Sequence, residues 1–224
     1  MPYSIAPSLA LNKDVYIKTW QLFIIILLAN LLAGWFYNEH VLTRDVYQNL
    51  LSEQLEAERI DEYFNFMRKL TLWGYIFQPI LTWIHVTFLV LLIQMPLILM
   101  MIDIPFRRLF RIVTCASLPM TASAFVKIFW LNNLPASEIS LASLSVVPLS
   151  IASILDASQY PQAAFTVLNK FSLFEAAWCF IIYKGLVRTE KLKKELAAFL
   201  VFCMWMLLLL LQWGITAYLN GVSG

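Results

Sequence analysis

The chain has 224 residues, of which 61% are hydrophobic and 13% are charged, and its formal net charge is +2. Soluble domains carry roughly 25% charged residues, so this composition excludes an ordinary soluble protein. The length allows one membrane domain and leaves no room for a second globular one. The basic residues are spread beside apolar segments, which argues against nucleic-acid binding, because that function needs a clustered basic face.

The apolar segments predict an all-α polytopic membrane protein with five spans. A transmembrane helix needs about 20 predominantly apolar residues, and most of the segments reach that length. Prolines inside the second and third segments, Pro79, Pro96 and Pro119, predict bent helices. A short lead, 1–18, precedes the first span. The predicted spans are 19–37, 71–102, 109–131, 171–187 and 196–219.

Basic residues mark one side of these spans. They gather in the turn between the second and third spans and in the turn between the fourth and fifth. Because cytoplasmic loops are enriched in Lys and Arg, the pattern predicts a cytoplasmic N-terminus and an outward C-terminus. We expect the same turns to lie near anionic lipid headgroups. Their basic residues are Arg107, Arg108, Arg111, Arg188, Lys191, Lys193 and Lys194.

The first outward segment, 38–70, holds half of the acidic residues and contains neither Gly nor Pro. Its apolar residues recur at helical spacing, which predicts one external amphipathic helix. The apolar stripe of that helix needs a surface to cover. The outer membrane face, the tops of neighbouring spans and a partner protein are the alternatives.

The second outward segment, 132–170, is the ambiguous part of the topology. Its apolar section, 139–155, contains five serines and Pro148. If this section crossed the membrane, the second basic turn would face outward, against the charge pattern. We therefore predict an external, interfacial or re-entrant segment, with a sixth span as the alternative.

Two stretches resemble the YIP family of Ypt/Rab-interacting integral membrane proteins. The first is Phe106-Arg-Arg-Leu-Phe-Arg-Ile-Val-Thr-Cys-Ala-Ser-Leu-Pro119, which is similar to the amphipathic stretch that leads into a span with a Leu-Pro signature. The second runs from Leu168-Asn-Lys-Phe-Ser-Leu-Phe-Glu-Ala-Ala-Trp178 to Lys184-Gly185-Leu186, and resembles the segment that ends in Gly-Leu before a basic turn and a final span. The predicted span count and N-terminal orientation agree with this resemblance.

Eukaryotic members of that family bind membrane-trafficking GTPases through a long cytoplasmic N-terminal region. This chain has about 18 residues before its first span and adds the acidic segment 38–70. The resemblance therefore implies a bacterial-type member in the inner membrane, without the GTPase-binding region.

Two charged residues lie inside predicted spans. Lys127 and Glu175 each stand about four residues from the predicted outer end of a span, which places both at a depth of about 6 Å. Because unpaired charge at that depth is unfavourable, we predict an ion pair between them. Separate contact of each charge with water and a functional site are the alternatives.

The second predicted span carries a polar face. Gln78, Thr82 and His85 recur at helical spacing on it. A polar residue inside a span usually faces other helices, so an interhelical hydrogen bond is the first expectation. A proton- or substrate-binding role is the alternative.

The sequence contains no recognisable catalytic set. There is no zinc-binding histidine pair, no Gly-rich phosphate loop and no nucleophile elbow, and Cys115, Cys179 and Cys203 lie in predicted spans without paired spacing. We therefore expect a protein that is not an enzyme and needs no cofactor or metal.

Two functions follow from these patterns. The first is a membrane-organising or complex-assembly scaffold that contacts the bilayer and other membrane proteins through 38–70 or the spans. The second is a subunit of a transporter or channel complex. A row of polar groups contributed by several spans would distinguish them in favour of the second, and none is evident in the sequence.

Overall fold

The computed structural model describes residues 18–52, 55–155 and 160–222, and these residues are almost entirely helical, without a named strand. The predicted all-α class is thus confirmed. Of the predicted cytoplasmic lead, 1–18, only Lys18 lies within the described residues. The elements are α1 (Thr19–Phe36), a π-helical turn (Tyr37–Val41), α2 (Arg44–Leu51), α3 (Ala57–Leu99), α4 (Phe106–Asn132), a 3₁₀ turn (Ala136–Glu138), α5 (Leu141–Ser145), a 3₁₀ turn (Ile151–Ile154), α6 (Gln162–Lys170), α7 (Leu173–Val187) and α8 (Lys194–Val222).

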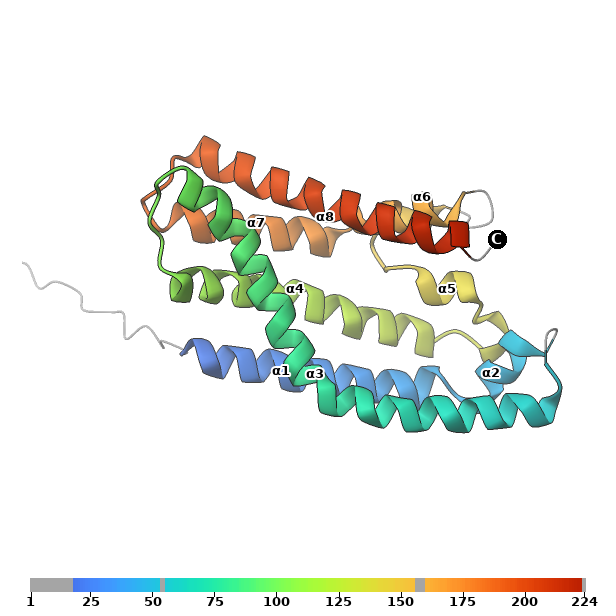
Figure 1. Cartoon of the computed structure of the whole chain (residues 1–224). Helices are drawn as coiled ribbons and strands as arrows, with labels where there is room; N and C mark the ends of the chain where they lie inside the picture. Colours follow the sequence, from blue (N-terminus) through green and yellow to red (C-terminus); the bar gives the residue numbers. More distant parts are fainter. Residues whose placement is uncertain (1–17, 53–54, 156–159, 223–224) are drawn as a thin grey trace, which may run out of the picture.

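The long helices form a bundle in which successive passes run in opposite directions (Figure 1). The passes are α1, α3, α4, α6 followed by α7, and α8. The start of α1 and the end of α8 lie at opposite ends of the bundle (Figure 1).

Among the described residues, four helices are long and apolar enough to cross a membrane, so the predicted count of five spans is not confirmed. They are Thr19–Val41, Ala57–Leu99, Phe106–Asn132 and Lys194–Leu219. The predicted fourth span, 171–187, corresponds to helix α7, whose 15 residues extend only about 22 Å and fall short of a hydrocarbon core of about 30 Å. The separate helix α6 precedes it, so this pass of the bundle is a broken helix.

The segment 38–70 does not form one external helix. It contains the π-helical turn, α2 and the first part of α3, which continues without interruption into the predicted second span. The physical reason is that apolar residues of this segment pack against one another and not against a separate surface. Tyr47 of α2 lies edge-on against Phe64 of α3, with ring centroids 5.4 Å apart. Arg44 of α2 also forms an ion pair with Asp61 of α3.

Helix α3 is 43 residues long and contains Pro79 and Pro96. It bends along its length, so that its first part lies beside α1 and α2 while its second part crosses the bundle obliquely (Figure 1). Proline removes a backbone hydrogen bond and clashes with the preceding turn, which accounts for a bend in a continuous helix.

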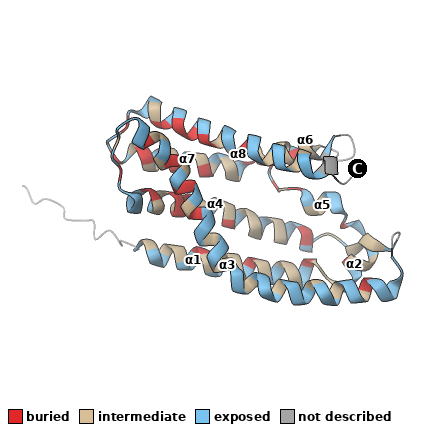
Figure 2. Ribbon diagram, in the orientation of Figure 1, coloured by how far each residue is buried: buried red, intermediate tan, exposed pale blue. Residues whose placement is uncertain are grey.

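The buried core is concentrated at one end of the bundle (Figure 2). Helix α4 packs there against α1, α3 and α7, while α8 packs against α7. Leu109 of α4 and both Ile182 and Leu186 of α7 are fully buried in this cluster. The lipid-facing surfaces of α1, α3 and α8 instead carry large exposed apolar side chains, as expected of helices whose solvent is hydrocarbon.

Candidate functional site

The break between α6 and α7 is held by an extended segment of the chain. The Ile151 N–H donates to the Phe171 carbonyl at 3.0 Å, and the Leu173 N–H donates to the Leu149 carbonyl at 3.1 Å. The Ser172 hydroxyl accepts from the Glu175 N–H and caps α7. Backbone groups that a helix break would otherwise leave unpaired inside a membrane are thereby satisfied.

The predicted outward segment 139–155 supplies this support and does not form a spanning helix. It folds into α5, a 3₁₀ turn and the extended stretch around Ser150. Asn169 of α6 fastens it, because its Oδ1 accepts from the Val147 N–H at 2.8 Å and its Nδ2 donates to the Ser145 carbonyl at 3.2 Å. Leu149 takes a positive φ of 60°, which is strained for a leucine.

An ion pair bridges the two sides of the break. Lys170, the last residue of α6, lies 2.9 Å from Glu175 in the first turn of α7, and the Glu175 side chain is only 12% exposed. Glu175 precedes the end of α7 at Val187 by 12 residues, about 18 Å along the helix. The pair therefore lies well inside the bundle.

The predicted pair between Lys127 and Glu175 is not the pair that the structure forms. Lys127 donates from Nζ to the Leu144 carbonyl at 2.6 Å, whereas Glu175 is engaged by Lys170. Lys127 lies about 32 Å along α4 from Phe106, well beyond the level of Glu175. Treating residue 171 as the outer end of a span placed Glu175 too close to the surface, because α6 adds a further helix beyond it.

Two neighbouring cavities border the ion pair, with volumes of about 420 Å³ and 290 Å³. Both are lined by Lys170 and Glu175 and by Gln212 of α8. Ser123 of α4 lines the first cavity, and His85 of α3 lines the second. Polar groups from α3, α4, α6, α7 and α8 thus converge on one place.

Aromatic residues close the inner side of the second cavity. Trp178 and Trp205 line it, and the Phe171 ring at the helix break meets the Trp205 ring edge-on, with centroids 5.2 Å apart. The Trp205 Nε1 is buried and has no hydrogen-bond partner among the described residues. The cavity therefore has a polar side at the ion pair and an aromatic side facing the core.

Only one residue of the predicted polar face of the second span lines a cavity at the helix break. His85 lines the second cavity, at its exposed edge. Gln78 and Thr82 are half-buried and line neither cavity. The structure therefore brings His85 alone from this set to the candidate site.

The two predicted basic turns meet at the end of the bundle that holds the buried core. Arg108 donates from Nη2 to the Arg188 carbonyl at 2.7 Å, and Lys191 donates to the Asp103 carbonyl. Hydrogen bonds therefore join the turn between α3 and α4 to the turn between α7 and α8. The seven predicted basic residues are all exposed: Arg107, Arg108, Arg111, Arg188, Lys191, Lys193 and Lys194.

Sequence reasoning missed Lys170 and Gln212. Lys170 was counted within an outward loop, so it was not considered as a partner for an intramembrane charge. Gln212 offered a usable signal, because it interrupts the apolar sequence Met206-Leu-Leu-Leu-Leu-Leu-Gln212 of the last span. An isolated polar residue in such a segment usually faces other helices.

The described residues contain no group of three or more His, Cys, Asp or Glu side chains arranged to hold a metal ion. The chemistry available at the helix break is therefore that of an ion pair, an amide and an imidazole in a partly apolar cavity. No protein-family model, no curated protein and no solved structure matches the chain.

Proposed function

We propose that the protein is a non-enzymatic membrane transport protein, or the solute-handling subunit of one, and that a small polar solute or ion binds at the break between α6 and α7. The observation that carries this proposal is the Lys170–Glu175 ion pair beside cavities to which five helices contribute polar or charged side chains. A row of polar groups from several helices is the feature expected of a transporter and not of a passive scaffold.

Physical chemistry supports this assignment. Ionisable groups within a membrane are costly, and they commonly mark substrate or ion pathways. Helices broken at the middle of a bundle are a recurrent means of bringing backbone and charge to a transported solute. The volumes of about 420 Å³ and 290 Å³ suit a small solute or a hydrated ion.

Each charged group has a role in this proposal. Glu175 accepts a cation or proton, Lys170 releases Glu175 when that ligand arrives, and Gln212 offers a neutral hydrogen-bonding group to it. His85 stands at the exposed edge of the second cavity and provides a second site for a proton. We place the protein in a bacterial inner membrane with a cytoplasmic N-terminus, in keeping with the basic turns.

Ion flux into proteoliposomes tests the proposal. Purified protein is reconstituted into vesicles that contain a fluorescent indicator for protons, sodium or potassium, and a gradient of the matching ion is applied to each. We expect flux above that of protein-free vesicles for at least one ion, and a loss of about tenfold or more in Glu175→Gln, since intramembrane carboxylates form proton and ion pathways. Glu138→Gln makes the same chemical change at an exposed site and should retain the wild-type rate. Wild-type vesicles no leakier than empty ones to any of the three ions would overturn ion transport at this site.

A scaffold that organises the membrane or assembles a complex is the second candidate. The resemblance to the YIP family supports it, as does the hairpin of α2 with the start of α3, which exposes Tyr63 by 42%. Affinity purification in mild detergent tests this function through the partner that it retains. Tyr63→Asp should release that partner while Glu62→Gln retains it, and equal recovery with both variants would contradict a scaffold role for the hairpin.

A further inference from the structure

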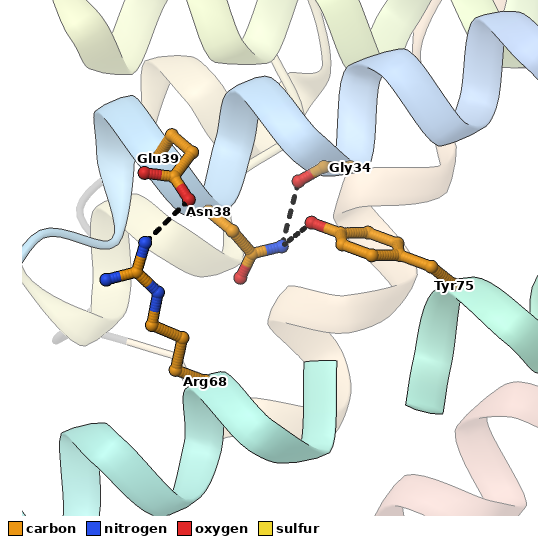
Figure 3. Close-up of polar contacts among 5 residues, drawn as sticks. All are labelled: Gly34, Asn38, Glu39, Arg68 and Tyr75. Atoms are coloured by element: carbon orange, nitrogen blue, oxygen red, sulfur yellow. Dashed lines mark hydrogen bonds and ion pairs between the residues drawn. The ribbon is translucent and has the colours of Figure 1, made fainter. Parts of the chain in front are cut away.

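A cavity of about 790 Å³ lies at the end of the bundle opposite the basic turns, apart from the helix break. Its walls are the end of α1 with its π-helical turn, the start of α2 and the first part of α3. Figure 3 shows five residues of this region, where Asn38 and Glu39 face Arg68 and Tyr75 of α3.

The cavity carries an excess of positive charge. Arg44, Arg68 and Lys69 line it, whereas Glu39 is the acid that lines it and Asp61 stands beside Arg44. The lining itself thus holds three cations and one acid, while Asp61 and Asp45 lie near Arg44 outside the lining. Lys69 is exposed and has no ion-pair partner among the described residues.

The ion pairs in this cavity leave hydrogen-bond donors free. Arg68 uses Nη2 to reach the Glu39 carboxylate at 3.0 Å, and its side chain is 63% exposed. A guanidinium has five N–H donors, so most of those on Arg68 remain available. The Tyr75 hydroxyl accepts from Asn38 Nδ2 at 3.2 Å, which leaves its own O–H to donate (Figure 3).

The residues around the cavity have the composition of a membrane–water interface. Exposed apolar side chains on α3 form a continuous lipid-facing surface from Leu70 and Trp73 onward, directly after Lys69. On α1, Trp35 is exposed and lines the same cavity. Tryptophan and basic side chains at the end of an apolar run are typical of the membrane–water interface.

We propose that this cavity binds the phosphodiester headgroup of an anionic phospholipid. Arg68 and Lys69 contact the phosphate, Tyr75 donates a hydrogen bond to it, and the acyl chains lie against Leu72 and Trp35. The volume is too large for a bare ion and accommodates a glycerophosphate group. The positive balance favours an anionic headgroup over a zwitterionic one, because the ammonium of the latter would meet Arg68 and Lys69.

Native mass spectrometry of the full chain tests this assignment, with phosphatidylglycerol and phosphatidylcholine added separately to the detergent-solubilised protein. We expect phosphatidylglycerol to bind more tightly, and Lys69→Gln to weaken that binding about fivefold, as one basic residue contributes roughly 1 kcal/mol near a charged lipid surface. Lys69 is exposed and bonded to nothing in the described residues, so its replacement leaves the fold intact.

Arg59→Gln provides the matched control. Arg59 lies on the same helix and is exposed, but it does not line the cavity. Its replacement should leave phosphatidylglycerol affinity unchanged. An equal loss in Arg59→Gln and Lys69→Gln, or equal binding of the two lipids, would overturn the proposal. A further arm adds soluble glycerol phosphate, and displacement of the lipid at comparable concentrations would show that the site serves a soluble phosphate compound instead of a lipid.

Discussion

The charge environment of Glu175 is set by a residue outside its own helix. Its carboxylate is largely buried, and the cation beside it, Lys170, comes from a different helix only five positions away. Burial makes such a group sensitive to the loss of its partner, because the remaining charge is left without compensation. The partial exposure of Lys170, 38% of its side chain, moderates that sensitivity.

A double-mutant cycle on this pair tests its contribution to stability. We expect Glu175→Gln and Lys170→Met each to lower the free energy of unfolding by about 1–2 kcal/mol, less than for a fully buried pair. The double variant should be more stable than the sum of the two losses implies, with a coupling above about 0.5 kcal/mol. Unfolding in mixed detergent micelles provides the measurement.

The cycle between Lys127 and Glu175 serves as its control. These two residues bind different groups, so their losses should add within about 0.5 kcal/mol. Coupling there, with additivity for Lys170 and Glu175, would contradict the structure.

Tyr47 of α2 gives a prediction about pH. Burial between α2 and α3, and the nearby Tyr63, raise the pKa of the Tyr47 phenol above its ordinary value of 10.0. The fold therefore favours the neutral phenol, and its contribution to stability is present below pH 10 and is lost as the pH rises through the higher folded value. The tyrosinate absorbance of wild type minus that of Tyr47→Phe should titrate with a midpoint above 10.0. A midpoint at or below that value would contradict the packing of α2 on α3.

At the scale of elements, the contact between α4 and α7 depends on a glycine. A Cβ added at Gly185 would lie 2.5 Å from Cγ2 and 2.9 Å from Cγ1 of Ile112. Side chains of β-branched residues in helices have little rotational freedom, so Ile112 cannot move aside without shifting the backbone. Gly185 thereby permits the close approach of the two helices that carry the centre of the core, which gives a physical reason for the Gly-Leu that follows Lys184.

Gly185→Ala should consequently destabilise the protein. We expect a loss of about 1–3 kcal/mol from overpacking, despite the gain in helix propensity of about 1 kcal/mol. Gly74→Ala is the matched control, since an added Cβ there meets no atom within 4 Å, and it should be neutral or slightly stabilising. Thermal unfolding in detergent measures both.

Removal of the obstructing side chain in Gly185→Ala/Ile112→Ala should make the two losses non-additive, and full additivity would argue against the contact.

At the scale of the whole molecule, the alternating passes predict which turns face the same side. Glu138 follows α4 and Glu195 lies in the first turn of α8, so the two stand at opposite ends of the bundle. After the native cysteines are replaced by alanine, a membrane-impermeant maleimide should label Glu138→Cys in intact cells. It should label Glu195→Cys only after permeabilisation, because the basic turns are expected in the cytoplasm. Labelling of both in intact cells would mean that the broken helix α6–α7 does not carry the chain across the membrane.

The sequence by itself determined the features that depend on local composition. Apolar runs of sufficient length yielded four helices of spanning length, and the pattern of apolar residues in 38–70 correctly indicated helix. Pro79 and Pro96 lie inside a bent helix, as expected. Hydrophobicity and periodicity can be read within one segment, which is why these predictions did not need the fold.

Only the tertiary structure decided which groups meet. The division of 38–70 into a hairpin, the interruption at Phe171 and Ser172, and the pairing of Glu175 with Lys170 all depend on contacts between separate segments. An apolar stripe does not specify whether lipid, another protein or its own chain covers it. Similarly, a charge in a span does not reveal its partner, because depth and rotation are set by how helices pack and where they break.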